Sequence, residues 1–319
     1  MPMHFEPLDF SRIRTYSIAA RKNKVSCQGF ARPYREGSTF ADFIATIPSI
    51  LAGGEYREII DSIVKAHLSR RLVLLTMGAH VIKVGLSPIV IDLVKRGIIN
   101  AIAFNGAGSV HDLEIALVGE TSENVADGIR EGTFGMVRET GDILNECALR
   151  AYEEKRGFGE VIGERISEAP FASMSIFAEA RKAGVPTTVH VALGSDIFHT
   201  HPAARGDAIG AASFHDFRLL CGIISQATEG SVIMNAGSAV VLPTVIEKAI
   251  AAARNLGCRV EGFTGINIDF LRQYRSLNNP VNRAKELGGK GYSLTGHHEF
   301  MIPLIAAGVI EELRRTAGN

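Results

Sequence analysis

The chain has 319 residues, 46% of them hydrophobic, which suffices for one large α/β domain or two smaller ones. Its 34 Lys and Arg residues balance 34 Asp and Glu residues, so the basic surface expected of a nucleic-acid-binding protein is missing. No window approaches the ~18 consecutive apolar residues that cross a bilayer, and the first residues form no apolar signal segment. We therefore expect a cytoplasmic protein that binds neither nucleic acid nor membranes.

Residues 1–70 are predicted to form an N-terminal arm followed by helices that pack on the core. Residues 1–40 show neither helical nor strand periodicity, which favours an extended arm against the body or against another subunit. From residue 40 to residue 68 apolar side chains recur at helical spacing. We expect two helices there, divided at Gly53-Gly54.

Residues 71–319 are predicted to form one α/β domain with a helical insertion around residues 119–165. Apolar runs, each followed by a turn and a helical pattern, indicate strands joined by helices, and such crossover connections make neighbouring strands parallel. The predicted fold class is a doubly wound, Rossmann-like parallel sheet with helices on both faces. The strands are expected at residues 72–76, 101–104, 185–191, 231–234 and 263–268.

The turns after these strands carry most of the residues that are able to do chemistry. The glycine-rich turn 105–109 leads into a helix, and N–H groups at such a turn can hold a phosphate. In a parallel sheet all these turns lie on one rim, where open α/β sheets bind ligands. We therefore expect a nucleotide crevice with imidazoles and carboxylates for proton transfer. The other groups on this rim are His80, Asp196, His199, His201, the turn 235–238 and residues 297–299.

Some of these residues have a second interpretation. Ser109 and Asp112 match a capping box, in which Asp112 caps its own helix. The four cysteines are isolated, which excludes a zinc ribbon, and the histidine pairs 199/201 and 297/298 match no zinc signature. Lys290 lies in a stretch, 269–291, that is polar and predicted to be irregular, so a solvated lysine is the alternative to a covalent role.

Five segments, in this order, resemble the deoxyhypusine synthase family over roughly residues 70–310. The resemblance implies that family's NAD-binding α/β fold and a tetramer with sites at subunit interfaces. It also implies NAD-dependent oxidation of a polyamine, followed by transfer of its aminobutyl group to a lysine. The segments are FNGAGSVHDLEIAL (104–117), GVPTTVHVALGSDIFHTH (184–201), SVIMNAGSAVVLP (231–243), GINIDF (265–270) and HHEFMIPLIAAGVI (297–310).

The resemblance also implies roles for individual residues. The catalytic lysine of the family falls nearest to Lys290, although the Trp-Gly-Lys motif around it is absent because the chain contains no Trp. The implied NAD contacts are Ala79, His80, Ala107, Gly108, Ser109, Asp112, Asp196, Gly237, Ser238 and Asn267.

Together these observations predict an NAD-dependent oxidoreductase or transferase without a metal, acting on a small, polyamine-like amine. Asp196 and either His199 or His201 would move the proton, and an imine at Lys290 is the expected route of any aminobutyl transfer. A homo-oligomer, most simply a tetramer, is expected because the closing helix 300–310 is apolar all round. The alternatives are a non-catalytic nucleotide-binding protein and a metal-assisted hydrolase built on His199, His201, His297 and His298.

Overall fold

The computed structural model describes residues 2–317 and contains one six-stranded sheet in which every neighbouring pair is parallel. The strand order is β3-β2-β1-β4-β5-β6. The chain winds outward from the centre in both directions, so the order reverses between β1 and β4, and the predicted doubly wound fold class is confirmed. The strands are β1 (Val73–Met77), β2 (Ala101–Asn105), β3 (Thr187–His190), β4 (Val232–Ala236), β5 (Thr264–Asp269) and β6 (Lys290–Thr295).

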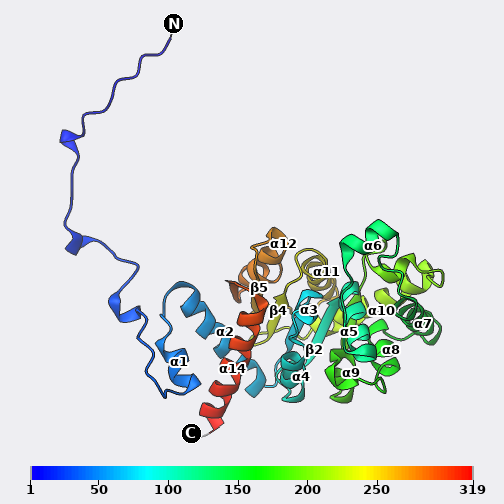
Figure 1. The fold of residues 1–319 in the computed structure, drawn as a ribbon. Coiled ribbons are helices and arrows are strands. Elements are labelled where there is room, and N and C mark those ends of the chain that lie inside the picture. Colours follow the sequence, from blue (N-terminus) through cyan, green and yellow to red (C-terminus); the bar gives the residue numbers. More distant parts are fainter. Residues whose placement is uncertain (1, 318–319) are drawn as a thin grey trace.

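Helices cover both faces of the sheet (Figure 1). Adjacent strand residues point to opposite faces, so Leu75 enters one hydrophobic core and Leu74 the other. The Leu74 core contains α10 (Gly206–Ile224), α11 (Val241–Asn255) and α13 (Arg283–Glu286). The Leu75 core contains α2 (Leu51–Leu68), α4 (Ser87–Lys95), α5 (Gly106–Val118), α7 (Arg138–Glu154), α8 (Phe158–Arg165), α9 (Ile176–Lys182) and α14 (His298–Ala317).

Residues 2–39 leave the body as an extended arm (Figure 1). Its apolar side chains are exposed, for example Phe5 at 81% and Leu8 at 83%. The two helices that follow are α1 (Phe40–Thr46) and α2. The predicted break at Gly53-Gly54 is wrong: the helices separate at residues 47–50, because Pro48 disfavours a helical residue before it. Both glycines lie in the first turn of α2.

Strand β3 lies at one edge of the sheet, and α10 packs along it. The carboxyl group of Asp216 on α10 accepts the N–H of Val189 (2.7 Å), and the hydroxyl of Ser213 donates to the carbonyl of Val189 (3.0 Å). The Ser213 hydroxyl also accepts the N–H of Val191 (3.2 Å). Helix α10 therefore satisfies the outward backbone groups of this edge strand.

The sixth strand was not predicted. The supposed irregular segment after β5 folds into α12 (Tyr274–Ser276), a wide turn and α13, and then begins β6 at Lys290. The strand contains two polar residues, a glycine and a lysine, and Leu294 is its one buried side chain, so it lacks an apolar run. The remaining short helices are α3 (His80–Lys83) and α6 (Val125–Glu131), and no helix within residues 2–317 is both long and apolar enough to span a bilayer.

Candidate active site

Two glycine turns meet where the strand order reverses. The N–H of Gly78 donates to the carbonyl of Ala236 (2.9 Å), and a Cβ on Gly78 would overlap the carbonyl oxygen of Gly237. Gly237 has φ +67°, a left-handed conformation that favours glycine, and a Cβ there would lie 2.9 Å from the His298 ring. The turns after β1 and β4 therefore approach as closely as two backbones can. Dinucleotides bind at this switch point in sheets of this strand order.

Polar side chains on neighbouring strands hold the second turn from inside the sheet. Thr76, Asn235 and Asn267 are in register, with the Thr76 hydroxyl 3.2 Å from Asn235 Oδ1. Asn235 Nδ2 donates to Asn267 Oδ1 (2.8 Å) and to the carbonyl of Ser238 (3.0 Å). Asn267, a predicted cofactor contact, is buried behind the turn and acts on it through Asn235.

The turn after β4 leads into a helix whose first turn is capped by a hydroxyl and by no charged side chain. Val240 at the N-cap of α11 makes no side-chain hydrogen bond, and the Ser238 hydroxyl accepts the N–H of Leu242 (3.2 Å). The first N–H groups of a helix have no partner within it, and the helix dipole favours negative charge there. Pro243 has no N–H and the N–H of Thr244 bonds to the carbonyl of Val240 (3.2 Å), so in this first turn the N–H of Val241 remains for an anion.

The start of α5, by contrast, is occupied by side chains of the chain itself. Asn105 Oδ1 accepts the N–H of Gly108 (3.0 Å), and the carboxyl group of Asp196 accepts the N–H of Ala107. Gly106 makes room for this carboxyl group, since a Cβ there would overlap both of its oxygens. The Ser109 hydroxyl donates to the carbonyl of Gly106 (2.6 Å). A carboxylate thus stands where the sequence predicted a phosphate.

Asp196 is 8% exposed, and burial raises its pKa to about 6. Its Oδ2 has no hydrogen-bond partner among residues 2–317. His199 lies beside it: its Nδ1 accepts the N–H groups of Gly194 (3.2 Å) and Asp196 (3.3 Å). Burial lowers the pKa of His199, so the ring is neutral and its Nε2 carries the hydrogen. His199 Nε2, like Asp196 Oδ2, is buried and has no hydrogen-bond partner among residues 2–317, so the loop after β3 holds an unused donor beside an unused acceptor.

Two of the predicted site residues point elsewhere. The His201 ring packs against Gly141 of α7, with its Nε2 3.5 Å from Asp142. Asp112 accepts the N–H groups of Ile176 (2.7 Å) and Phe177 (3.3 Å) and so caps α9, which corrects the prediction that it caps its own helix. The hydroxyl of Ser175 completes this cap, and burial raises the pKa of Asp112 to about 6.

An aromatic cluster lies beside the switch point. The His80 ring is 5.4 Å from the His298 ring and 5.6 Å from the ring of Phe270, while His297 stacks on Phe270 at 6.3 Å. His298 is fully buried, with Nε2 3.1 Å from the carbonyl of Ile268. Phe270 is 45% exposed and offers a flat surface to a planar ring. Sequence analysis missed Phe270, although it directly follows β5.

The histidines do not converge as the metal-hydrolase alternative requires. His199 and His201 follow β3, whereas His297 and His298 follow β6, at the opposite edge of the sheet. The His298 ring, however, packs against Gly237 near the centre of the sheet, while the His201 ring packs against Gly141 of α7. Within residues 2–317 no three His, Cys, Asp or Glu side chains form a group that could hold a metal ion. A site built on these four histidines is therefore wrong.

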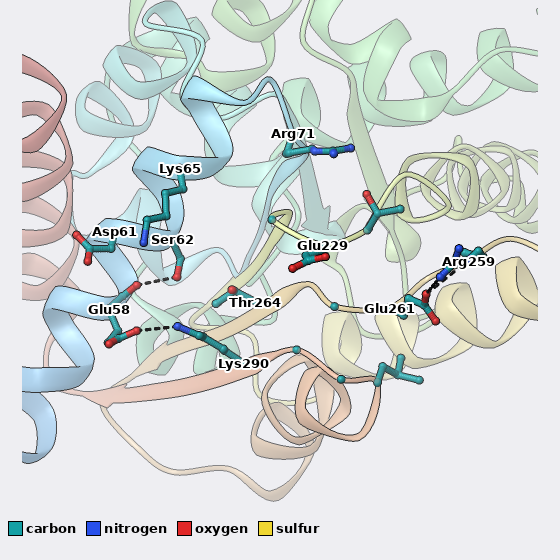
Figure 2. A pocket seen from close by; sticks show the side chains of 16 residues that line it. Glu58, Asp61, Ser62, Lys65, Arg71, Glu229, Arg259, Glu261, Thr264 and Lys290 are labelled. Atoms are coloured by element: carbon teal, nitrogen blue, oxygen red, sulfur yellow. Dashed lines mark hydrogen bonds and ion pairs between the residues drawn. The ribbon is translucent and has the colours of Figure 1, made fainter. Parts of the chain in front are cut away.

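Lys290 lies at the other end of the sheet from the rim. It begins β6, and its Nζ is 3.0 Å from an oxygen of Glu58 on α2. Figure 2 shows this pair in the wall of a cavity of 870 Å³. Thr264, the first residue of β5, lies in the same wall. The hydrogen bond that Lys290 donates to Glu58 raises the pKa of Lys290, which keeps the amine protonated. The structure does not bring Lys290 to the other predicted site residues.

A smaller cavity, of 200 Å³, opens beside Asp196 on the rim. Its wall contains Lys83, which the sequence analysis did not include among the site residues, together with two glutamates. These are Glu114 of α5 and Glu123 of the segment before α6. The candidate active site thus combines the switch point, the open start of α11 and this charged cavity.

Comparison with solved structures finds the same fold in other proteins. No protein-family model and no curated protein matches the chain. AgrE in complex with ornithine and NAD⁺ is similar at TM-score 0.52 and 13% identity, over 85% of this chain and 35% of AgrE. A "putative deoxyhypusine synthase" from Entamoeba histolytica is similar at TM-score 0.51 and 13% identity, over 88% of this chain and 96% of that one.

At these identities the likeness concerns the fold. The chain therefore has a deoxyhypusine synthase-like α/β fold, as its motifs indicated, and it spans about a third of the length of AgrE.

Proposed function

We propose that this protein is an NAD-dependent enzyme that oxidises a small, polyamine-like amine. The observation that carries the proposal is the contact of the Gly78 and Gly237 turns where the strand order reverses. This is the position at which doubly wound sheets of this order bind dinucleotides. AgrE shares this fold and its structure contains NAD⁺, which supports NAD⁺ as the cofactor of this chain.

The residues of the switch point fit such a cofactor. The missing side chains of Gly78 and Gly237 let the two turns and His298 pack together, which fixes the switch point, and the start of α11 after Ser238 carries no side-chain anion that would repel a pyrophosphate. Ala79 and His80 begin α3 on the other side of the turns, and the exposed ring of Phe270 suits a planar base. Bound NAD⁺ would supply the acceptor for the hydride that leaves the carbon beside the amine.

The chain itself would move the proton. Oxidation of an amine to an imine removes a hydride from carbon and a proton from nitrogen, and Asp196 Oδ2 is the acceptor we propose for that proton. With a pKa of about 6 this carboxyl group is mostly ionised at neutral pH. The Nε2–H of His199 orients the substrate as a donor. We restrict the proposal to oxidation, because aminobutyl transfer needs a lysine at the rim and Lys290 lies at the other end of the sheet.

Titration calorimetry with NAD⁺ tests the cofactor site. Gly237→Val should abolish NAD⁺ binding, because a side chain there is strained and collides with His298. Gly210→Ala, in α10 with open space around it, is the matched control and should bind like the wild type. Circular dichroism checks that both variants are folded. Unchanged affinity in folded Gly237→Val would contradict the proposal.

We also propose that the protein is a homo-oligomer, most simply a tetramer, held in part by the arm. Residues 1–39 contain seven Lys and Arg against three Asp and Glu, so the neutral chain carries four more acidic than basic residues in its body. Exposed apolar side chains such as those of Phe5 and Leu8 favour burial on a partner. Light scattering of the full chain and of a variant that lacks residues 2–39 tests this. A full chain that is monomeric would exclude it.

A further inference from the structure

Strand β4, helix α11 and strand β5 form a crossover of the kind that binds a nucleotide. The two strands are parallel neighbours, and the glycine turn between β4 and α11 lies at the switch point. In nucleotide-binding units of this kind, an acidic residue further along the unit accepts a hydrogen bond from the ribose. Here the second strand of the unit ends at an acidic residue, Asp269.

Asp269 lies directly beside the glycine turn. The register of the two strands pairs Ala236 with Ile268, and the N–H of Gly237 donates to the carbonyl of Ile268 (3.1 Å). Asp269 is the next residue, and neighbouring strands are about 4.8 Å apart. Because successive strand residues alternate between the two faces, its side chain points to the same face as that of Asn267, which is the face that α11 covers.

The carboxyl group of Asp269 has a free oxygen. The residue is 5% exposed, and its Oδ1 accepts the N–H of Phe270 (2.8 Å). Its Oδ2 accepts no hydrogen bond from residues 2–317, but unlike Asp196 Oδ2 it is not sealed inside the protein. The group forms no ion pair with the described residues. A carboxyl group this buried normally has partners, and the hydroxyls of a ligand would supply them.

The unit on the other side of the switch point offers less to a nucleotide. Its second strand, β2, ends at Asn105, whose Oδ1 accepts the N–H of Gly108 (3.0 Å). The helix after the β1 turn, α3, has four residues, whereas α11 has 15. Of the two units at the switch point, the β4–β5 unit therefore combines a long helix for the phosphate with a free carboxyl group for the ribose.

We propose that Asp269 accepts the ribose hydroxyls of the adenosine half of NAD⁺ and thereby excludes NADP⁺. The extra phosphate of NADP⁺ is on the 2′ position of that ribose, where it would face the carboxylate of Asp269. Such a contact between like charges is strongly unfavourable. The exposed ring of Phe270, the next residue, is placed to stack on the adenine. The inference rests on the proposed function, because it needs a dinucleotide at the switch point.

The same assignment fixes the direction of the dinucleotide across the sheet. With the adenosine over β5, the nicotinamide half extends past the switch point toward β1 and β2. Asp196 lies on that side, against Gly106, the first residue after β2. The ring that accepts the hydride and the carboxyl group that accepts the proton therefore belong to the same half of the rim.

Titration calorimetry on the full chain tests this with NAD⁺ and NADP⁺, which differ by the one phosphate. The wild type should bind NAD⁺ at least about tenfold more tightly. Asp269→Asn keeps an acceptor for the N–H of Phe270 but removes the charge. It should weaken NAD⁺ binding about tenfold and leave NADP⁺ binding unchanged or stronger. Asp92→Asn, on the surface of α4 beside Arg96, is the matched control and should alter neither.

The outcomes separate this inference from the proposed function. Equal affinities of the wild type for the two dinucleotides, or a preference for NADP⁺, would overturn the inference and leave the cofactor site standing. The same holds if the ratio of the two affinities is unchanged in Asp269→Asn. The comparison in the wild type needs no variant, so it decides the matter even if Asp269→Asn folds poorly. If the wild type binds neither dinucleotide, the proposed function itself fails.

Discussion

The two halves of the rim stabilise their helix starts in different ways. Around β2 and β3 three buried carboxyl groups accept first-turn N–H groups: Asp196 at α5, Asp112 at α9 and Asp216 at α8. Around β4 and β5 neutral groups do this instead: the amides of Asn235 and Asn267 shape the turn, and the Ser238 hydroxyl accepts a first-turn N–H of α11. The comparison teaches that a glycine turn before a helix is open to phosphate only where the chain supplies no anion of its own.

Removing a carboxyl group from the β2–β3 half should have the largest effect. Asp216→Ala leaves the buried N–H groups of Gly159 (2.9 Å from Oδ2) and Val189 (2.7 Å) without an acceptor. We expect the free energy of unfolding in urea to fall by roughly 3–5 kcal/mol. Asp207→Ala, exposed at the start of the same helix, should change the free energy of unfolding far less. Equal losses in the two variants would show that the buried carboxyl group is not needed.

The same half should make stability depend on pH. Burial raises the pKa of Asp216 to about 7, whereas an Asp in the unfolded chain titrates near 3.8. Between these values the folded state binds more protons than the unfolded state, so stability falls as pH rises through the folded pKa. From pH 5 to pH 8 the free energy of unfolding should decrease by roughly 2–3 kcal/mol more in the wild type than in Asp216→Asn. Parallel curves for the two proteins would contradict this assignment.

A change in the amide half should act on the cofactor more than on the fold. Asn235→Ala removes the hydrogen bonds to Ser238 and Asn267, and the turn after β4 loses its support. We expect NAD⁺ affinity to fall about tenfold in calorimetry. Asn100→Ala, which removes a bond to the N–H of Val73 at the amino end of β1, should leave NAD⁺ affinity unchanged. Equal NAD⁺ affinities in the two variants would show that Asn235 and its hydrogen bonds do not support the cofactor site.

Much of the fold could be predicted because strands β1 to β5 are apolar or β-branched runs that end in turns. Strand β6 could not, since Leu294 is its one buried side chain, and this error left Lys290 in a supposed loop near the rim. The gathering of Asp196 and Gly237 on one rim followed from parallel topology alone. The capping of α9 by Asp112 did not, because its partner Ser175 lies 63 residues further along the chain.

The chemistry of His199 was beyond sequence reasoning for a different reason. The residue type predicted a base, but two backbone N–H groups occupy its Nδ1 and fix the other nitrogen as a donor. Those N–H groups belong to the loop after β3, and periodicity does not describe the path of a loop. Sequence patterns thus placed His199 correctly after β3. Which of its ring nitrogens carries the hydrogen could be inferred only from the structure.

The contact of α10 with the edge strand β3 has a consequence for how copies of the chain can join. An uncovered edge strand is a template on which another strand can add, and this leads to aggregation and to continuous sheets across subunits. Here Asp216 and Ser213 already hold the outward groups of Val189 and Val191. The sheet is therefore closed to growth on this side, and any assembly of the protein has to form without extending the sheet past β3.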